Sequence, residues 1–478
     1  MRNVLALALL FTGSAALCQT PSTAPGHESR VHSDFRREWL QLHPCAQQAV
    51  QPCKPLTFGN LVDVGQELFT GQPLHIAAGS LAPQNGFGLG LAFVEHTDFP
   101  SEWRFTYNTD AVATPNGSWR AGFYLKGYRL SGGKIVVVQG PGKKQSPFFH
   151  TAPVFNLYAE GDSLNQLYYF GLGPDTLPAA RSSFGLTEAI VGANAVVPLG
   201  AAAVSFTGEI NGRVPQLHGA TTGSVPAVQQ VYTDATAPGL TTQPAFIEPG
   251  IGVRMQPALL AQHLRLNYLV QFQDYSSIGQ SASSFRRWTA DLNHEIPMDT
   301  KVRLTAASNQ NGPDSCAPTP DVKCPSPTHV SSALNHEGWI DFRLLMVGSA
   351  AGAHSAVPFY FDPTVGGSDI NGQPLLPSYP DYRFHAPNLV LLRETIEHAI
   401  PKVPLGAYFS ADEGKVALRR GDIDFSNLRH SFSAGITVHA GGLPVVYLLF
   451  AWGGNEGNHT TFQVSNVLLG ASARPSLF

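Results

Sequence analysis

Charge is scarce in this sequence. Charged residues make up 13% of the 478 residues, about half of the ~25% that is usual for soluble globular chains. The 30 basic and 34 acidic residues leave a formal net charge of −4, which gives no electrostatic basis for binding nucleic acid. The composition therefore argues against both an ordinary soluble enzyme and a nucleic-acid-binding protein.

Long apolar runs are also missing beyond the N-terminus. Arg2, the apolar run Val4–Phe11 and the small residues that follow have the pattern of a signal peptide, which we assign to residues 1–18 with cleavage near Cys18. No later segment has the ~20 consecutive apolar residues that a transmembrane helix needs. We therefore expect an exported protein that is either soluble outside the cytoplasm or inserted in a membrane as a β-barrel.

The common catalytic and metal-binding motifs are absent from the sequence. It has no G-x-S-x-G elbow, and His294-Glu295 and His336-Glu337 lack the second histidine of a zinc-protease helix. The 17 histidines are scattered without ligand spacing. We expect a protein that is not an enzyme and that has no metal site and no cofactor.

Cysteine is rare, and four of the cysteines lie in two close pairs along the sequence. The sequence has five cysteines, and cleavage after Cys18 leaves two close pairs. In an oxidising compartment such pairs favour local disulfides, Cys45–Cys53 and Cys316–Cys324. Free thiols remain the alternative, and zinc is disfavoured because no histidine lies at ligand spacing beside either pair.

What the sequence does contain, from about Leu74 onward, is a period-two alternation of apolar and polar residues. It is clear in Trp103–Asp110, Leu264–Gln273, Arg287–Ile296 and Ile340–Met346, and it predicts strands with one apolar and one polar face. A soluble sandwich with a wet outer face shares this pattern. Strands of about ten residues with aromatic residues near their ends instead favour a membrane barrel whose polar face lines the lumen.

We therefore predict an all-β chain with three parts. A signal peptide (1–18) and a polar, Pro- and Gln-rich periplasmic lead-in (19–70) precede an antiparallel, membrane-spanning β-barrel (71–478). At roughly 25 residues per strand and connection, the barrel has about sixteen strands, an even number as in single-chain bacterial barrels. The terminal Phe478 is typical of the C-terminal signal that sorts barrels to the bacterial outer membrane.

A long loop within Phe359–His398 carries the most specific motifs. Val365-Gly366-Gly367-Ser368-Asp369, with Leu376–Phe384 after it, resembles the in-folded loop of the bacterial surface-antigen family, the barrel domain of outer-membrane assembly proteins such as BamA and TamA. Tyr169–Asp175 resembles a strand motif of that family, and Phe409–Val416 with Leu428–Ser431 resembles a strand pair. The resemblance covers roughly residues 70–478.

The resemblance implies that the loop lies in the barrel lumen. Its expected site residues are Gly366, Gly367, Tyr379, Asp381, Arg383 and Phe384. This sequence has Pro377-Ser378 where the family has an Arg-Gly step, so Arg383 is expected to supply the charged contact instead. Its candidate partners on the lumen wall are Glu394 and Asp412.

The resemblance also implies a function. The family acts in protein insertion or translocation, or in organising the outer membrane, through a weak seam between first and last strands and local thinning of the lipid. The partners would be outer-membrane lipid, client outer-membrane proteins and separate periplasmic chaperones or POTRA-bearing proteins, because residues 19–70 are too few for a POTRA domain. The alternative is a passive pore or structural barrel that has lost insertase activity.

Overall fold

The computed structural model of the chain describes residues 73–99, 102–129, 153–199, 203–220, 225–260, 263–300, 335–401, 403–440 and 443–464. The signal peptide, the lead-in segment, both cysteine pairs and Phe478 lie outside these residues, so those expectations stay predictions. None of the helices in the described ranges is long and apolar enough to cross a membrane.

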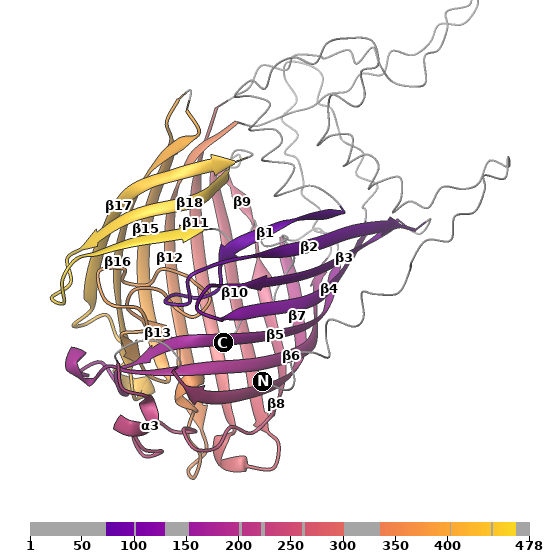
Figure 1. Cartoon of the computed structure of the whole chain (residues 1–478). Helices are drawn as coiled ribbons and strands as arrows, with labels where there is room; N and C mark the ends of the chain where they lie inside the picture. Colours follow the sequence, from indigo (N-terminus) through magenta and orange to yellow (C-terminus); the bar gives the residue numbers. More distant parts are fainter. Residues whose placement is uncertain are drawn as a thin grey trace, which may run out of the picture.

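Most of the described chain is β-strand (Figure 1). The strands are β1 (Leu74–Ser80), β2 (Phe87–Asp98), β3 (Trp103–Ala113), β4 (Trp119–Arg129), β5 (Val154–Tyr169), β6 (Ser182–Pro198), β7 (Val204–Gly219), β8 (Phe246–Met255), β9 (Ala258–Leu259), β10 (Leu264–Ser277), β11 (Phe285–Thr300), β12 (Asn335–Ala351), β13 (Thr364–Val365), β14 (Phe384–His385), β15 (Asn388–Ala399), β16 (Leu405–Ala417), β17 (Arg429–Ala440), β18 (Leu443–Trp452) and β19 (His459–Val464). The short helices are η3 (Pro178–Ala180), α3 (Val228–Val231), η5 (Ser281–Ser283), η6 (Phe359–Phe361) and η7 (Arg420–Asp422).

All strands except β13 and β14 form one antiparallel sheet in which each strand pairs with the next along the chain. Strands β8 and β9 both pair with β10 and act as one interrupted strand, so the 17 strands of the sheet fill sixteen positions. The prediction of about sixteen antiparallel strands is confirmed.

The sheet curls until its first and last strands are neighbours again. The Cα atoms of β1 and β19 come within 8 Å of each other, although the described residues of these two strands form no ladder with one another. Because the number of strands is even, the start of β1 and the end of β19 lie at the same end of the barrel. The connection from β12 to β15 emerges at the opposite end.

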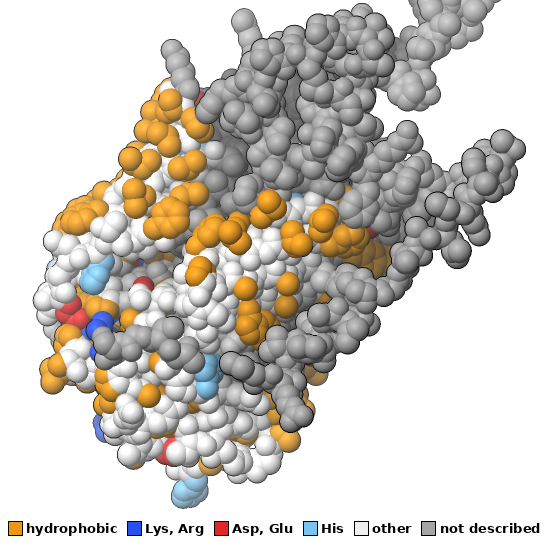
Figure 2. All heavy atoms as spheres, viewed as in Figure 1, with side chains coloured by type: hydrophobic (Ala, Val, Ile, Leu, Met, Phe, Trp, Pro, Cys, Tyr) orange, Lys and Arg blue, Asp and Glu red, His pale blue; other side chains and the backbone are white. Residues whose placement is uncertain are grey.

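The two faces of the sheet differ sharply, as the alternation predicts. On β7 the outward residues Phe206, Ile210 and Val214 are 46–56% exposed, whereas Asn211 and Arg213, which point inward, are 2% exposed. Figure 2 shows hydrophobic side chains gathered on the outer surface over β17 and β18. An apolar outer belt around a polar interior is the arrangement of a barrel that faces lipid.

The core lies inside the barrel, toward the end where the β12–β15 connection emerges. The three rings of η6 (Phe359–Phe361) are at most 3% exposed. Phe359 packs against Tyr169 and Phe184, with ring centroids 4.7 and 5.1 Å apart, and Phe361 packs against Phe246 at 5.1 Å. The connection is therefore held in the lumen by burial of aromatic rings from both sides.

Candidate functional site: the in-folded loop

The candidate site is the connection of residues 352–387, which joins β12 to β15. Its hairpin, β13 paired with β14, brings residues 364–365 beside residues 384–385. The tip between them folds back on itself: Gly366 N–H donates to Leu375 O (2.7 Å), and Tyr382 N–H donates to Gly366 O (3.0 Å). Hydrogen bonds within the loop thus make it compact, independently of its contacts with the barrel wall.

Gly366 and Gly367 allow this folding because no other residue fits there. Their φ angles are +110° and +60°, in the region that favours glycine. A Cβ on Gly366 would lie 2.4 Å from the Cβ of Arg383, and one on Gly367 would lie 2.3 Å from Oδ1 of Asp381. Asp381 Oδ1 also accepts the N–H of Ser368 at 2.9 Å. The two glycines therefore let the two arms of the loop touch.

Arg383 anchors the loop to two separate connections of the barrel. The side chain is 1% exposed. Its Nε donates to Glu456 Oε2 (2.6 Å) between β18 and β19, and its Nη1 and Nη2 donate to the hydroxyl (2.7 Å) and carbonyl (2.5 Å) of Thr176 between β5 and β6. The guanidinium also lies over the rings of Phe170 and Phe384, 4.9 and 4.4 Å from their centroids.

These contacts correct the predicted partners of Arg383. Glu394 is exposed on the outer face of β15, because its inward neighbours on that strand are Arg393 and Thr395. Asp412 does face the lumen, but its carboxylate binds Arg393 Nε and Nη2, each at 2.7 Å. The guanidinium of Arg393 already binds the carboxylate of Asp412, and Arg383 pairs with Glu456 instead.

Backbone amides make the wall contact where the family motif has Arg-Gly. Leu376 N–H donates to Asp412 Oδ2 (3.1 Å), and Ser378 N–H donates to Ser431 Oγ on β17 (2.8 Å). Pro377, between them, has no N–H to donate. The wall carboxylate is therefore shared between a guanidinium from the wall and a backbone amide from the loop.

The opposite side of the loop contacts the turn between β1 and β2. Gln84 Nε2 donates to Asp381 Oδ2 (2.6 Å), and the Tyr382 hydroxyl donates to Pro83 O (3.0 Å). Burial raises the pKa of Asp381, and the hydrogen bond from Gln84 opposes that rise. The loop is therefore tied both to the first hairpin and to the last strands of the sheet.

Tyr379 and Phe384 form the apolar part of the site. Their rings meet edge to face with centroids 5.5 Å apart, and Arg429 of β17 lies 4.2 Å from the Phe384 centroid. His385, beside Phe384, is 4% exposed, and burial lowers the pKa of its imidazole to about 4. At neutral pH the packing around His385 therefore holds a neutral ring.

Two residues that hold the loop were not predicted. Thr176 directly follows the Tyr169–Asp175 motif, and this position was the available signal. Glu456 lies in a Gly-rich turn with no local pattern that marks it as a partner of Arg383. In the described part of the chain, no cluster of three or more His, Cys, Asp or Glu side chains has the geometry to hold a metal ion.

No family model matches the chain, and no curated protein matches it. Among solved structures it is similar to BamA from Haemophilus ducreyi lacking POTRA domains 1–3 (9% identity, TM-score 0.45, 82% of this chain and 69% of that one). It is also similar to CdiB from Acinetobacter baumannii (12%, 0.42, 92% and 72%) and CdiB from Escherichia coli (11%, 0.45, 83% and 63%). These values are too low to assign the chain to a family, and the fold rests on the strand pairing described above.

Proposed function

We propose that this chain is an outer-membrane β-barrel of the surface-antigen type that acts in protein insertion or translocation, or in organising the outer membrane. The observation that carries the proposal is the loop with the Gly366–Phe384 motif, which lies inside the lumen and is anchored to connections on both sides of the barrel. A loop held by a buried guanidinium is unlike the mobile loops that line an open channel. We propose no enzymatic activity for it.

The direction of the strands gives the protein a proposed orientation in the membrane. The end of the barrel at which β1 begins and β19 ends would face the periplasm, where clients and chaperones meet it.

The test is an insertion assay with the purified full chain in liposomes. We expect the protein to accelerate the folding of an unfolded outer-membrane client relative to empty liposomes. The matched variant is Arg383→Ala, which weakens the anchoring of the loop to the barrel. Client folding at the rate of empty liposomes would refute the proposal.

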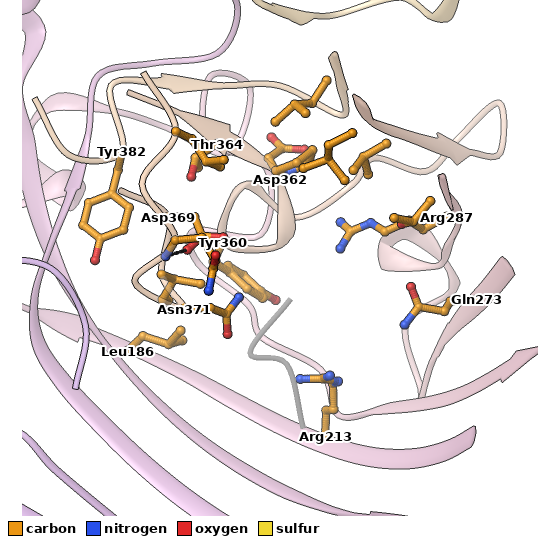
Figure 3. Close-up of a pocket in the computed structure, with 18 of the residues that line it drawn as sticks. Leu186, Arg213, Gln273, Arg287, Tyr360, Asp362, Thr364, Asp369, Asn371 and Tyr382 are labelled. Atoms are coloured by element: carbon orange, nitrogen blue, oxygen red, sulfur yellow. Dashed lines mark hydrogen bonds between the residues drawn. The ribbon is translucent and has the colours of Figure 1, made fainter. Parts of the chain in front are cut away.

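The alternative function, a passive pore, is tested on the same sample. The in-folded loop borders two cavities of the lumen, of about 590 (Figure 3) and 880 Å³, and Asn371 and Gln373 of the loop line both. We therefore expect low, fluctuating conductance in planar bilayers. A large and steady conductance of the wild-type chain would favour the pore.

A further inference from the structure

The outer face of the barrel carries a carboxylate in the middle of its apolar belt. Glu394 is the seventh of the twelve residues of β15, and its side chain is exposed on the outer face. Its neighbours on that face are Leu392 and Ile396 along the strand, Phe342 on β12 and Ala411 on β16. All four are apolar, so Glu394 lies among side chains suited to lipid.

No described residue neutralises this carboxylate. Within the described ranges Glu394 makes no hydrogen bond and no ion pair. The adjacent Arg393 points into the lumen, where its guanidinium binds Asp412. An ionisable side chain that faces hydrocarbon is destabilising to an extent that grows with depth, and such residues usually have a partner. The position of Glu394 therefore calls for a partner that approaches from the lipid side.

A second polar side chain lies in the same row of the outer face. The ladders pair His294 on β11 with Phe342 on β12, and Phe342 with Glu394 on β15. His294 points outward, because Asp291 and Asn293, which have the opposite parity on β11, line the lumen cavities. An imidazole and a carboxylate therefore flank Phe342, one on each side.

His294 and Glu394 do not pair within one chain. Two strand spacings, about 9.5 Å, separate them along the row, and Phe342 lies between them. The Tyr268 hydroxyl contacts Nε2 of His294 at 2.6 Å, so Nδ1 is the ring nitrogen left for another contact. A face with an imidazole on one side of its centre and a carboxylate on the other is self-complementary, as a two-fold dimer requires.

We propose that this face of β11, β12 and β15 binds a second copy of the chain within the membrane, with the two-fold axis beside Phe342. The rotation places Glu394 of each copy opposite the partner's His294, so two charge-assisted hydrogen bonds form together. The two Phe342 side chains meet at the centre of the contact. The proposal rests on the membrane-spanning placement in the proposed function, and not on a role in insertion.

A lipid headgroup fits Glu394 less well than a second copy does. Glu394 lies six residues from one end of β15 and five from the other, which is roughly 20 and 17 Å along the strand. Headgroups lie at the two surfaces of the bilayer, beyond the reach of a glutamate side chain at that depth. A partner that is itself embedded in the membrane reaches it, and this chain presents the complementary imidazole on the same face.

Sedimentation equilibrium of the purified full chain in density-matched detergent micelles tests the proposal. We expect a reversible dimer whose dissociation constant rises at least tenfold in Glu394→Gln and in His294→Gln. The exchanged variant, Glu394→His with His294→Glu, keeps the complementarity and should restore the affinity to within a few-fold of wild type. The matched control is Glu95→Gln, a carboxylate on β2, on the far side of the sheet, which should leave association unchanged.

Disulfide cross-linking in liposomes tests where the contact lies. Phe342→Cys should link two copies under mild oxidation, whereas Leu91→Cys, at a site 58% exposed on the outer face of β2, should not. A chain that fails to insert into liposomes contradicts the proposed function, on which the dimer depends. Three results overturn the dimer alone: an inserted chain that stays monomeric, a dimer that Glu394→Gln leaves unchanged, or equal cross-linking at both cysteine sites.

Discussion

Arg383→Ala removes the guanidinium that joins the loop to two connections of the barrel. The variant loses the bond to Glu456 and both bonds to Thr176. Removing one partner of a buried ion pair costs about 3–5 kcal/mol. Glu456 is 12% exposed and regains water when the loop leaves, so the lower end applies. At 1.4 kcal/mol per factor of ten, about 3 kcal/mol raises the population of the released loop roughly hundredfold.

Limited proteolysis of the folded protein measures this population. When the loop opens and closes faster than it is cut, the rate of cleavage follows the open fraction. A broad-specificity protease is needed, because the substitution removes the single tryptic site between residues 369 and 383. We expect cleavage in this segment to accelerate about a hundredfold, with fragments mapped by mass spectrometry.

The control for this experiment is Arg265→Ala. Arg265 pairs with Glu295 at 3.0 Å on the barrel wall, with both side chains more than a third exposed, and such pairs contribute about 0–1 kcal/mol. Cleavage of the loop should stay near the wild-type rate in this variant. If Arg383→Ala also leaves the rate unchanged while the barrel remains folded, the guanidinium does not anchor the loop.

Three further predictions concern the same loop and wall. Gly367→Ala should increase cleavage of the loop, because a Cβ there would lie 2.3 Å from a carboxylate oxygen, whereas Gly421→Ala, with open space around it, should not. Asp412→Asn should lower the midpoint of unfolding by the equivalent of about 3 kcal/mol, because it breaks a buried pair with Arg393; an unchanged midpoint would contradict the pairing. The pKa of His385 is depressed to about 4 in the folded state, so its contribution to stability is complete above the unfolded pKa of about 6.5 and is lost as the pH falls toward 4, by about 3 kcal/mol. His385→Phe should flatten that part of the stability curve, and an equal slope in both proteins would refute the assignment.

The strands were predictable because the sequence pattern that specifies each strand lies within the strand itself. In β7 and β10 successive side chains point alternately to the apolar outer surface and to the polar interior. This period of two is visible within any ten residues. The loop was predictable as a loop because glycine, proline and asparagine interrupt this alternation. Its two glycines were singled out by motif, and their positive φ angles give the physical reason for them.

The residues that contact the loop were harder to predict from the sequence. The direction in which Glu394 points follows from which register β15 adopts, and a shift by one residue would have turned it inward. Glu456 and Thr176 meet Arg383 from positions 73 and 207 residues away in the chain. No local pattern encodes such distances.

The sequence by itself determined the architecture: an all-β chain, roughly sixteen strands and a loop too polar for a core. These properties depend on composition and short-range periodicity. Only the tertiary structure decided which carboxylate holds Arg383, that Arg393 satisfies Asp412, and that the rings of Phe359 and Phe361 are buried against β5, β6 and β8. These contacts form only when the sheet curls into a barrel, because the curling brings residues that are far apart in the sequence to the same interior. Charged side chains there must then find partners on distant strands.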